Sequence, residues 1–137
     1  MSTWRIIDAN LNRASEGLRV LDDIARFVLN DAEISKGLRA IRHDIMDAAK
    51  GVTAELLKHR ASEEDVGAEA EATSKKDMTA LARANFKRVQ EALRVLEETA
   101  KLPEARGKLD SDCFRKARFA AYSLEKQLLP RLPRRAE

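Results

Sequence analysis

The chain has 137 residues and a formal net charge of only +3, although it carries 26 basic and 23 acidic side chains. One Trp, one Tyr and four Phe, with no basic stripe between them, disfavour nucleic-acid binding. The apolar runs are too short for a membrane span, and we expect no signal peptide ahead of Trp4. The single cysteine, Cys113, excludes an internal disulfide and a cysteine-based metal cage. We therefore expect a cytoplasmic protein that binds neither nucleic acid nor membrane.

Composition also predicts the fold class. Leu, Ala, Glu, Lys and Arg dominate, whereas Gly (five residues) and Pro (three residues) are scarce. This balance favours an all-α protein. The length suits one helical domain over residues 1–137.

Two segments of the chain repeat one another. Residues 9–23 match residues 84–98 at a constant offset of 75, with eight identities in fifteen positions. Apolar identities could come from helical patterning alone, but polar residues shared at one spacing indicate an internal duplication. The shared polar pairs are Asn10/Asn85, Arg13/Arg88, Glu16/Glu91 and Arg19/Arg94. Residues 38–43 also resemble residues 114–119, at an offset of 76, so we expect each half to be a helical hairpin.

The two halves, residues 4–59 and 79–130, should form a bundle of two duplicated hairpins with about four long helices. Apolar residues at three- and four-residue steps predict helices over 4–29, 32–59 and 79–102, and a fourth from Asp110 to Pro130. In the first helix the predicted inward residues are Ile7, Leu11, Ala14, Leu18, Leu21, Ala25 and Val28.

The polar stretch 60–78 joins the halves and should be a long central loop. A connection of this length is usually either functional or a solvated linker, and the sequence pattern favours the linker. The basic tail, residues 131–137, should be frayed or the stub of a linker.

Two small features of the first helix fall inside its apolar stripe. Gly17, whose repeat counterpart is Ala92, indicates close helix packing. Asn10 needs a hydrogen-bond partner if it is buried. That partner is either Asn85 across the pseudo-twofold axis or a bound ligand, and the sequence leaves both open.

Each half of the chain carries the same polar set, Asn, Arg, Glu and Arg, on one flank of its first helix. Arg42 and Arg118 occupy matching places on the second helix of each half. Arginine suits carboxylate and phosphate ligands, so two copies facing one cleft would make an anion site. The alternative is a set of surface ion pairs, Arg13 to Glu16 and Glu16 to Arg19, worth a few tenths of a kcal/mol each.

Four segments, residues 6–21, 38–43, 65–67 and 84–98, carry a resemblance to a known family. They are similar to the small helical hydroxymethylpyrimidine phosphate kinases of thiamin biosynthesis, found alone or fused in front of thiamin phosphate synthase. The resemblance implies phosphoryl transfer from ATP, with Mg²⁺, to the pyrimidine phosphate. It also implies thiamin phosphate synthase as a partner, and leaves open whether the chain is a homodimer.

On this resemblance we assign three groups of site residues. The catalytic group is Arg13, Arg19 and Arg88. The substrate-binding group is Asn10, Asn85, Arg42, His43, Arg94 and Arg118. The candidate metal ligands are Asp65, Glu16 and Glu91, and the stretch 60–78 would act as a lid.

Two other classes of function stay open. One is a non-catalytic helical module that dimerises or docks on thiamin phosphate synthase. The other is an arginine-rich helical mutase of the chorismate mutase sort, which needs no metal. A requirement for magnesium would favour the kinase over both.

Overall fold

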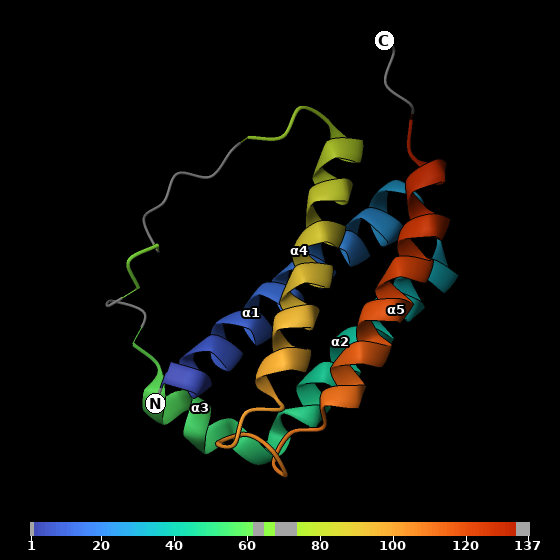
Figure 1. Cartoon of the computed structure of the whole chain (residues 1–137). Helices are drawn as coiled ribbons and strands as arrows, with labels where there is room; N and C mark the ends of the chain where they lie inside the picture. The colour runs from blue at the N-terminus through green and yellow to red at the C-terminus, as the bar shows by residue number, and fades with distance from the viewer. Residues whose placement is uncertain (1, 62–64, 68–73, 134–137) are drawn as a thin grey trace.

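The computed structural model describes residues 2–61, 65–67 and 74–133. Parts of the expected loop (62–64 and 68–73) and of the expected tail (134–137) lie outside the described residues. Five α-helices are seen in the described part: α1 (Ser2–Asp23), α2 (Ala32–Ala48), α3 (Thr53–His59), α4 (Met78–Thr99) and α5 (Ser111–Leu128). The described ranges contain no β-strand, and the four long helices pack as a bundle (Figure 1), which confirms the predicted fold class.

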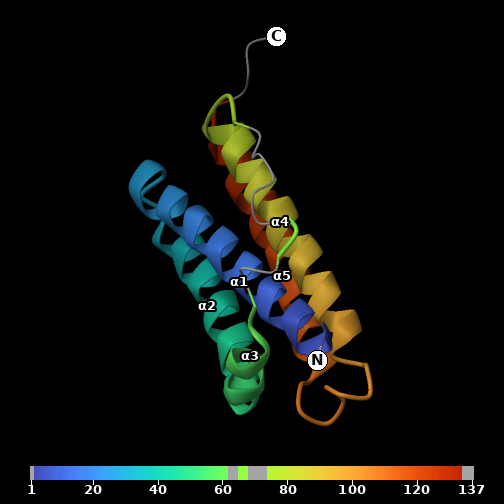
Figure 2. The same ribbon diagram turned by 90° about the vertical axis from the view of Figure 1, so that its left-hand side faces the viewer.

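The bundle consists of two helical hairpins. α1 pairs with α2, and α4 pairs with α5. The hairpins meet where α1 lies on α4 and α2 lies on α5, with the most extensive contact between α1 and α4. Figure 2 shows the two hairpins side by side, and Figure 1 shows α1 crossing α4. Helices that correspond in the repeat therefore pack on each other, as expected for a duplicated hairpin.

Aspartate side chains begin three of the long helices. The Asp31 carboxylate accepts a hydrogen bond of 2.9 Å from the Ile34 amide at the start of α2, which lowers the pKa of Asp31. At the start of α4 the Asp77 carboxylate accepts from the Ala80 amide, and at the start of α5 the Asp110 carboxylate accepts from the Asp112 amide. Such caps satisfy amides that have no partner within the helix.

The predicted helix over residues 32–59 is interrupted. A 3₁₀ turn, η2 (Lys50–Val52), separates α2 from α3. Gly51 lies in this turn, and glycine disfavours a helix interior by about 1 kcal/mol relative to alanine.

The predicted helix over residues 4–29 changes type near its end. α1 continues into a π-helix, η1 (Ile24–Val28), whose wider turn shifts the register of the side chains. Val28 is therefore 45% exposed, and its predicted inward position is wrong. The other predicted inward residues of this helix are buried.

Close packing of α1 on α4 depends on Gly17. A Cβ atom at this position would lie 2.7 Å from Val89 Cγ2 and 3.4 Å from the Asn85 carbonyl oxygen. Real Cβ contacts are almost never so short, so glycine is required for the observed approach. The prediction that Gly17 serves close helix packing is confirmed.

Candidate functional site

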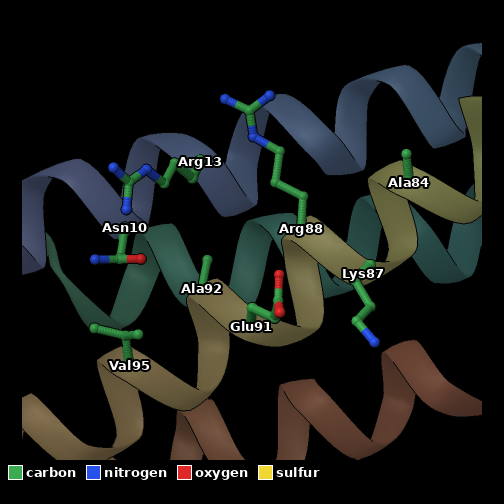
Figure 3. Close-up of a pocket in the computed structure, with 8 residues that line it drawn as sticks. All are labelled: Asn10, Arg13, Ala84, Lys87, Arg88, Glu91, Ala92 and Val95. Carbon is green, nitrogen blue, oxygen red and sulfur yellow. The ribbon is translucent and has the colours of Figure 1, made fainter. Parts of the chain in front are cut away.

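An open groove of about 480 Å³ runs along the crossing of α1 and α4. α1 contributes Asn10 and Arg13, and α4 contributes Arg88 and Glu91 with their neighbours (Figure 3). The remaining lining residues are Ala84, Lys87, Ala92 and Val95. The groove thus brings together four of the residues that the repeat singled out, from both halves of the chain.

The groove carries more positive than negative charge. Arg13, Lys87 and Arg88 contribute three cations, whereas Glu91 is the one carboxylate among the lining residues. Neither Arg13 nor Arg88 forms a hydrogen bond or ion pair with any other described residue. Guanidinium groups without a carboxylate partner, collected in one hollow, are suited to bind an anion.

The alternative of surface ion pairs is not observed. Glu16 forms no ion pair with Arg13 or Arg19 within the described part of the chain, although all three lie on α1 at the required spacing. On α1 the repeated polar residues are therefore not explained by local pairing along the helix.

The two repeated asparagines make identical hydrogen bonds. Asn10 Nδ2 donates to the Ile6 carbonyl oxygen and Asn85 Nδ2 donates to that of Leu81, both at 2.9 Å. Each bond lies within one helix, so of the two alternatives for Asn10 the hydrogen bond to Asn85 is not formed, and the ligand contact stays a prediction. Asn10 is only 5% exposed and still lines the groove, and Figure 3 shows its amide between the two helices.

Other predicted binding residues lie elsewhere. Arg19 and Arg42 line a second, smaller hollow between α1 and α2, where Arg42 Nε donates to Ser15 Oγ at 2.9 Å. Arg94 pairs with Glu98 on the exposed face of α4. His43 is exposed on α2 and is absent from the lining of both hollows.

Arg118 is held by a carboxylate. Its Nη2 lies 2.8 Å from Glu97 Oε1, and both side chains are nearly buried, at 11% and 9% exposure. The Glu97 hydrogen bond raises the pKa of Arg118 further above its usual value. Phe119 and Tyr122 pack against the same guanidinium, with ring centroids 5.0 Å and 6.0 Å from Arg118 Cζ. This arrangement gives Arg118 a structural role in joining α4 to α5.

The three candidate metal ligands are not brought together. Across residues 2–61, 65–67 and 74–133, no group of three or more His, Cys, Asp or Glu side chains is placed to hold a metal ion. Glu91 lines the groove, whereas the exposed Asp65 accepts a hydrogen bond from the Gly67 amide in its own turn. Asp65, Glu16 and Glu91 therefore remain predicted alternatives for a metal ligand, of which Glu91 lines the groove.

Sequence reasoning missed two features near the groove. Lys87 lines it, but its repeat counterpart is Asn12, so comparison of the halves gave no signal. Asp8 is 8% exposed and binds Arg60 through two contacts of 2.8 Å and 2.6 Å. That pair ties the start of the stretch after α3 to the first half of α1, two residues from Asn10.

The fold and the groove together define the class of protein. It is a helical bundle built from two copies of one hairpin, with a cationic groove between the repeat-related helices α1 and α4. Residues 5–127 match the ThiD2 family, and the chain belongs to this family. No solved structure matches the chain significantly. In the described ranges no helix is both long and apolar enough to cross a membrane.

The chain is similar to part of several curated thiamine-phosphate synthases. It is 39% identical to a thiamine-phosphate synthase of a Synechocystis species, over 91% of this chain and 36% of that protein. It is 37% identical to the thiamine-phosphate synthase of Nostoc punctiforme, over 92% of this chain and 35% of that protein. It is 35% identical to the thiamine-phosphate synthase of Rhodopirellula baltica, over 90% of this chain and 33% of that protein. The chain thus spans about a third of the length of these curated relatives.

Proposed function

We propose that this protein phosphorylates hydroxymethylpyrimidine phosphate to the diphosphate, with ATP as the donor. The observation that carries the proposal is the pair of guanidiniums, Arg13 and Arg88, which share one groove of a ThiD2-family chain and have no hydrogen-bond or ion-pair partner among the described residues. The similarity to thiamine-phosphate synthases supports the biosynthetic context. The nature of the reaction comes from the resemblance of residues 6–21 and 84–98 to the pyrimidine phosphate kinases.

The groove supplies what phosphoryl transfer demands of a protein. This reaction needs mainly positioning of the two substrates and stabilisation of charge on the transferred group. Arg13 and Arg88, on helices that cross, would bind phosphate oxygens from two sides, and Lys87 would add a third positive charge.

Asn10 is suited to recognise the aminopyrimidine. Its Nδ2 is held by the Ile6 carbonyl oxygen, which fixes the orientation of the amide and leaves Oδ1 as the free end. An amide oxygen accepts hydrogen bonds, so Oδ1 would accept one from the exocyclic amino group of the pyrimidine.

A magnesium ion fits this groove only in company with phosphate. Glu91 is the one carboxylate among the lining residues. Mg²⁺ in phosphoryl-transfer enzymes is commonly held by one or two carboxylates, substrate phosphates and water. Glu91 would therefore hold an ion that arrives with the nucleotide, and that ion would neutralise phosphate charge.

The test is a steady-state assay of ATP and hydroxymethylpyrimidine phosphate in which the diphosphate product is measured. We expect Arg13→Ala and Arg88→Ala each to lower turnover, the more severe variant by about 100-fold, since losing a donor to the transferring group costs about 3 kcal/mol. A kinase binds two different molecules, so the two variants should differ from each other by about tenfold or more.

Arg106→Ala is the matched control, because Arg106 is exposed and lies outside the groove. It should keep wild-type turnover, and all three variants should keep the helical circular dichroism spectrum. Wild-type turnover in both groove variants would contradict the assignment of the groove. Absence of the diphosphate product with the unaltered chain would instead favour a docking module for thiamine-phosphate synthase.

A further inference from the structure

The second hollow lies between the end of α1 and the first half of α2 and has a volume of about 180 Å³. Its lining consists of four arginines, two aspartates and two leucines: Arg19, Arg26, Arg39, Arg42, Asp22, Asp23, Leu18 and Leu38. It shares no lining residue with the groove between α1 and α4.

The internal repeat provides a comparison for these charges. Positions 19, 26, 39 and 42 correspond to cations at 94, 101, 115 and 118, and Asp22 and Asp23 correspond to Glu97 and Glu98. In the C-terminal half every one of the four cations has a carboxylate partner. The ion pairs are Arg94–Glu98, Lys101–Glu98, Arg115–Asp112 and Arg118–Glu97.

In the N-terminal half the same four positions are not neutralised. None of the four arginines forms an ion pair with a carboxylate of the described residues. Arg42 donates a hydrogen bond to the Ser15 hydroxyl. Arg26 stacks on Phe27, with its Cζ atom 4.9 Å from the ring centroid. The Asp22 carboxylate instead accepts a hydrogen bond from Ser35.

Two sequence differences account for the contrast. Asp22 and Asp23 are each one methylene shorter than their counterparts Glu97 and Glu98, so their carboxylates reach less far from α1. Position 36 is a lysine, whereas its counterpart is Asp112, the partner of Arg115. The N-terminal half thus keeps the cations of the repeat, and Asp22 and Asp23, although they line the same hollow, form no ion pair with them among the described residues.

We propose that this hollow is a second anion site, which binds a phosphate or diphosphate group through Arg19, Arg39 and Arg42. The bond from Arg42 Nε to Ser15 Oγ orients the guanidinium and leaves its two terminal nitrogens for the ligand. Sites for drug-sized ligands enclose about 300–1,000 Å³, so a hollow of this size suits a small anion. The inference goes beyond the proposed function, because it requires no transfer reaction.

The test is titration of the ¹⁵N-labelled chain with inorganic phosphate and, separately, inorganic diphosphate, at constant ionic strength and without metal. We expect saturable shifts of the Nε–Hε resonances of Arg19, Arg39 and Arg42. Arg39→Gln removes a charged donor and should weaken binding about tenfold or more. Lys36→Asp supplies the missing counterpart of Asp112 and should weaken binding at least as much.

Arg115→Gln is the matched control, since Arg115 is the repeat counterpart of Arg39 and already pairs with Asp112. It should leave anion binding unchanged. The inference is overturned if the unaltered chain shows no saturable shift at these arginines, or if Arg115→Gln weakens binding as much as Arg39→Gln. Because the readout is binding, either result is distinct from failure of the kinase assay.

Discussion

Replacing Gly17 with alanine adds one methyl group where α1 lies directly against α4. In the middle of a helix this change stabilises by about 1 kcal/mol, because alanine has the higher helix propensity. Here, however, the new Cβ would lie 2.7 Å from Cγ2 of Val89. Val89 is fully buried and has a stiff, β-branched side chain, so the contact cannot be relieved by a rotamer change at the surface.

Overpacking of a core by a methyl group usually destabilises by about 1–3 kcal/mol. If overpacking costs about 2 kcal/mol and the higher helix propensity of alanine returns about 1 kcal/mol, the free energy of unfolding falls by about 1 kcal/mol. For a chain of this size that corresponds to a decrease of about 4 °C in the melting temperature. Thermal and urea unfolding followed by circular dichroism would measure both quantities.

Gly51→Ala is the control, because a Cβ at position 51 would have no atom within 4 Å. It should leave stability unchanged or raise it by about 0.4–1 kcal/mol. The double variant Gly17→Ala/Val89→Ala should be more stable than the sum of the two single effects, since removing Cγ2 makes room for the new methyl group. If Gly17→Ala is as stable as Gly51→Ala, α1 and α4 are not packed as closely as described.

Two further expectations concern charged groups. Glu97→Gln leaves Arg118 without its carboxylate and should destabilise the fold by about 2 kcal/mol in urea unfolding. Glu98→Gln, at an exposed ion pair, should cost well under 1 kcal/mol, and equal effects would contradict a structural role for Arg118. Asp31 and Asp112 have lowered pKa values in the folded protein. The stabilisation that these two carboxylates give the folded state is therefore complete above the unfolded pKa of about 3.9, and it is lost as pH falls through their pKa values in the folded protein. Asparagine at both positions should flatten the acid side of a stability–pH curve, and an unchanged curve would refute this.

The fold was largely predictable from the sequence because helix formation and amphipathic packing are encoded by local spacing. Apolar residues at three- and four-residue steps gave the helices, and the repeat of residues 9–23 at 84–98 gave the paired hairpins. The exceptions, the π-helix that ends at Val28 and the break at Gly51, depend on how the helix ends pack against neighbouring elements. The spacing of apolar residues along the sequence carries no information on this packing.

The candidate site was predictable only in part. The repeat pointed to Asn10, Arg13 and Arg88, and tertiary structure places these three in one groove. It also pointed with equal weight to Arg42 and Arg118, which occupy equivalent positions and have different surroundings.

The tertiary structure decided which arginines are placed within reach of a carboxylate. Glu97 reaches Arg118 across the α4–α5 contact, whereas the shorter Asp22 accepts a hydrogen bond from Ser35 and Arg42 turns to Ser15. An ion pair between helices depends on side-chain length and on the partner that the packing places opposite. The sequence determined where the charges stand along each helix, and the packing of the hairpins determined which of them are neutralised.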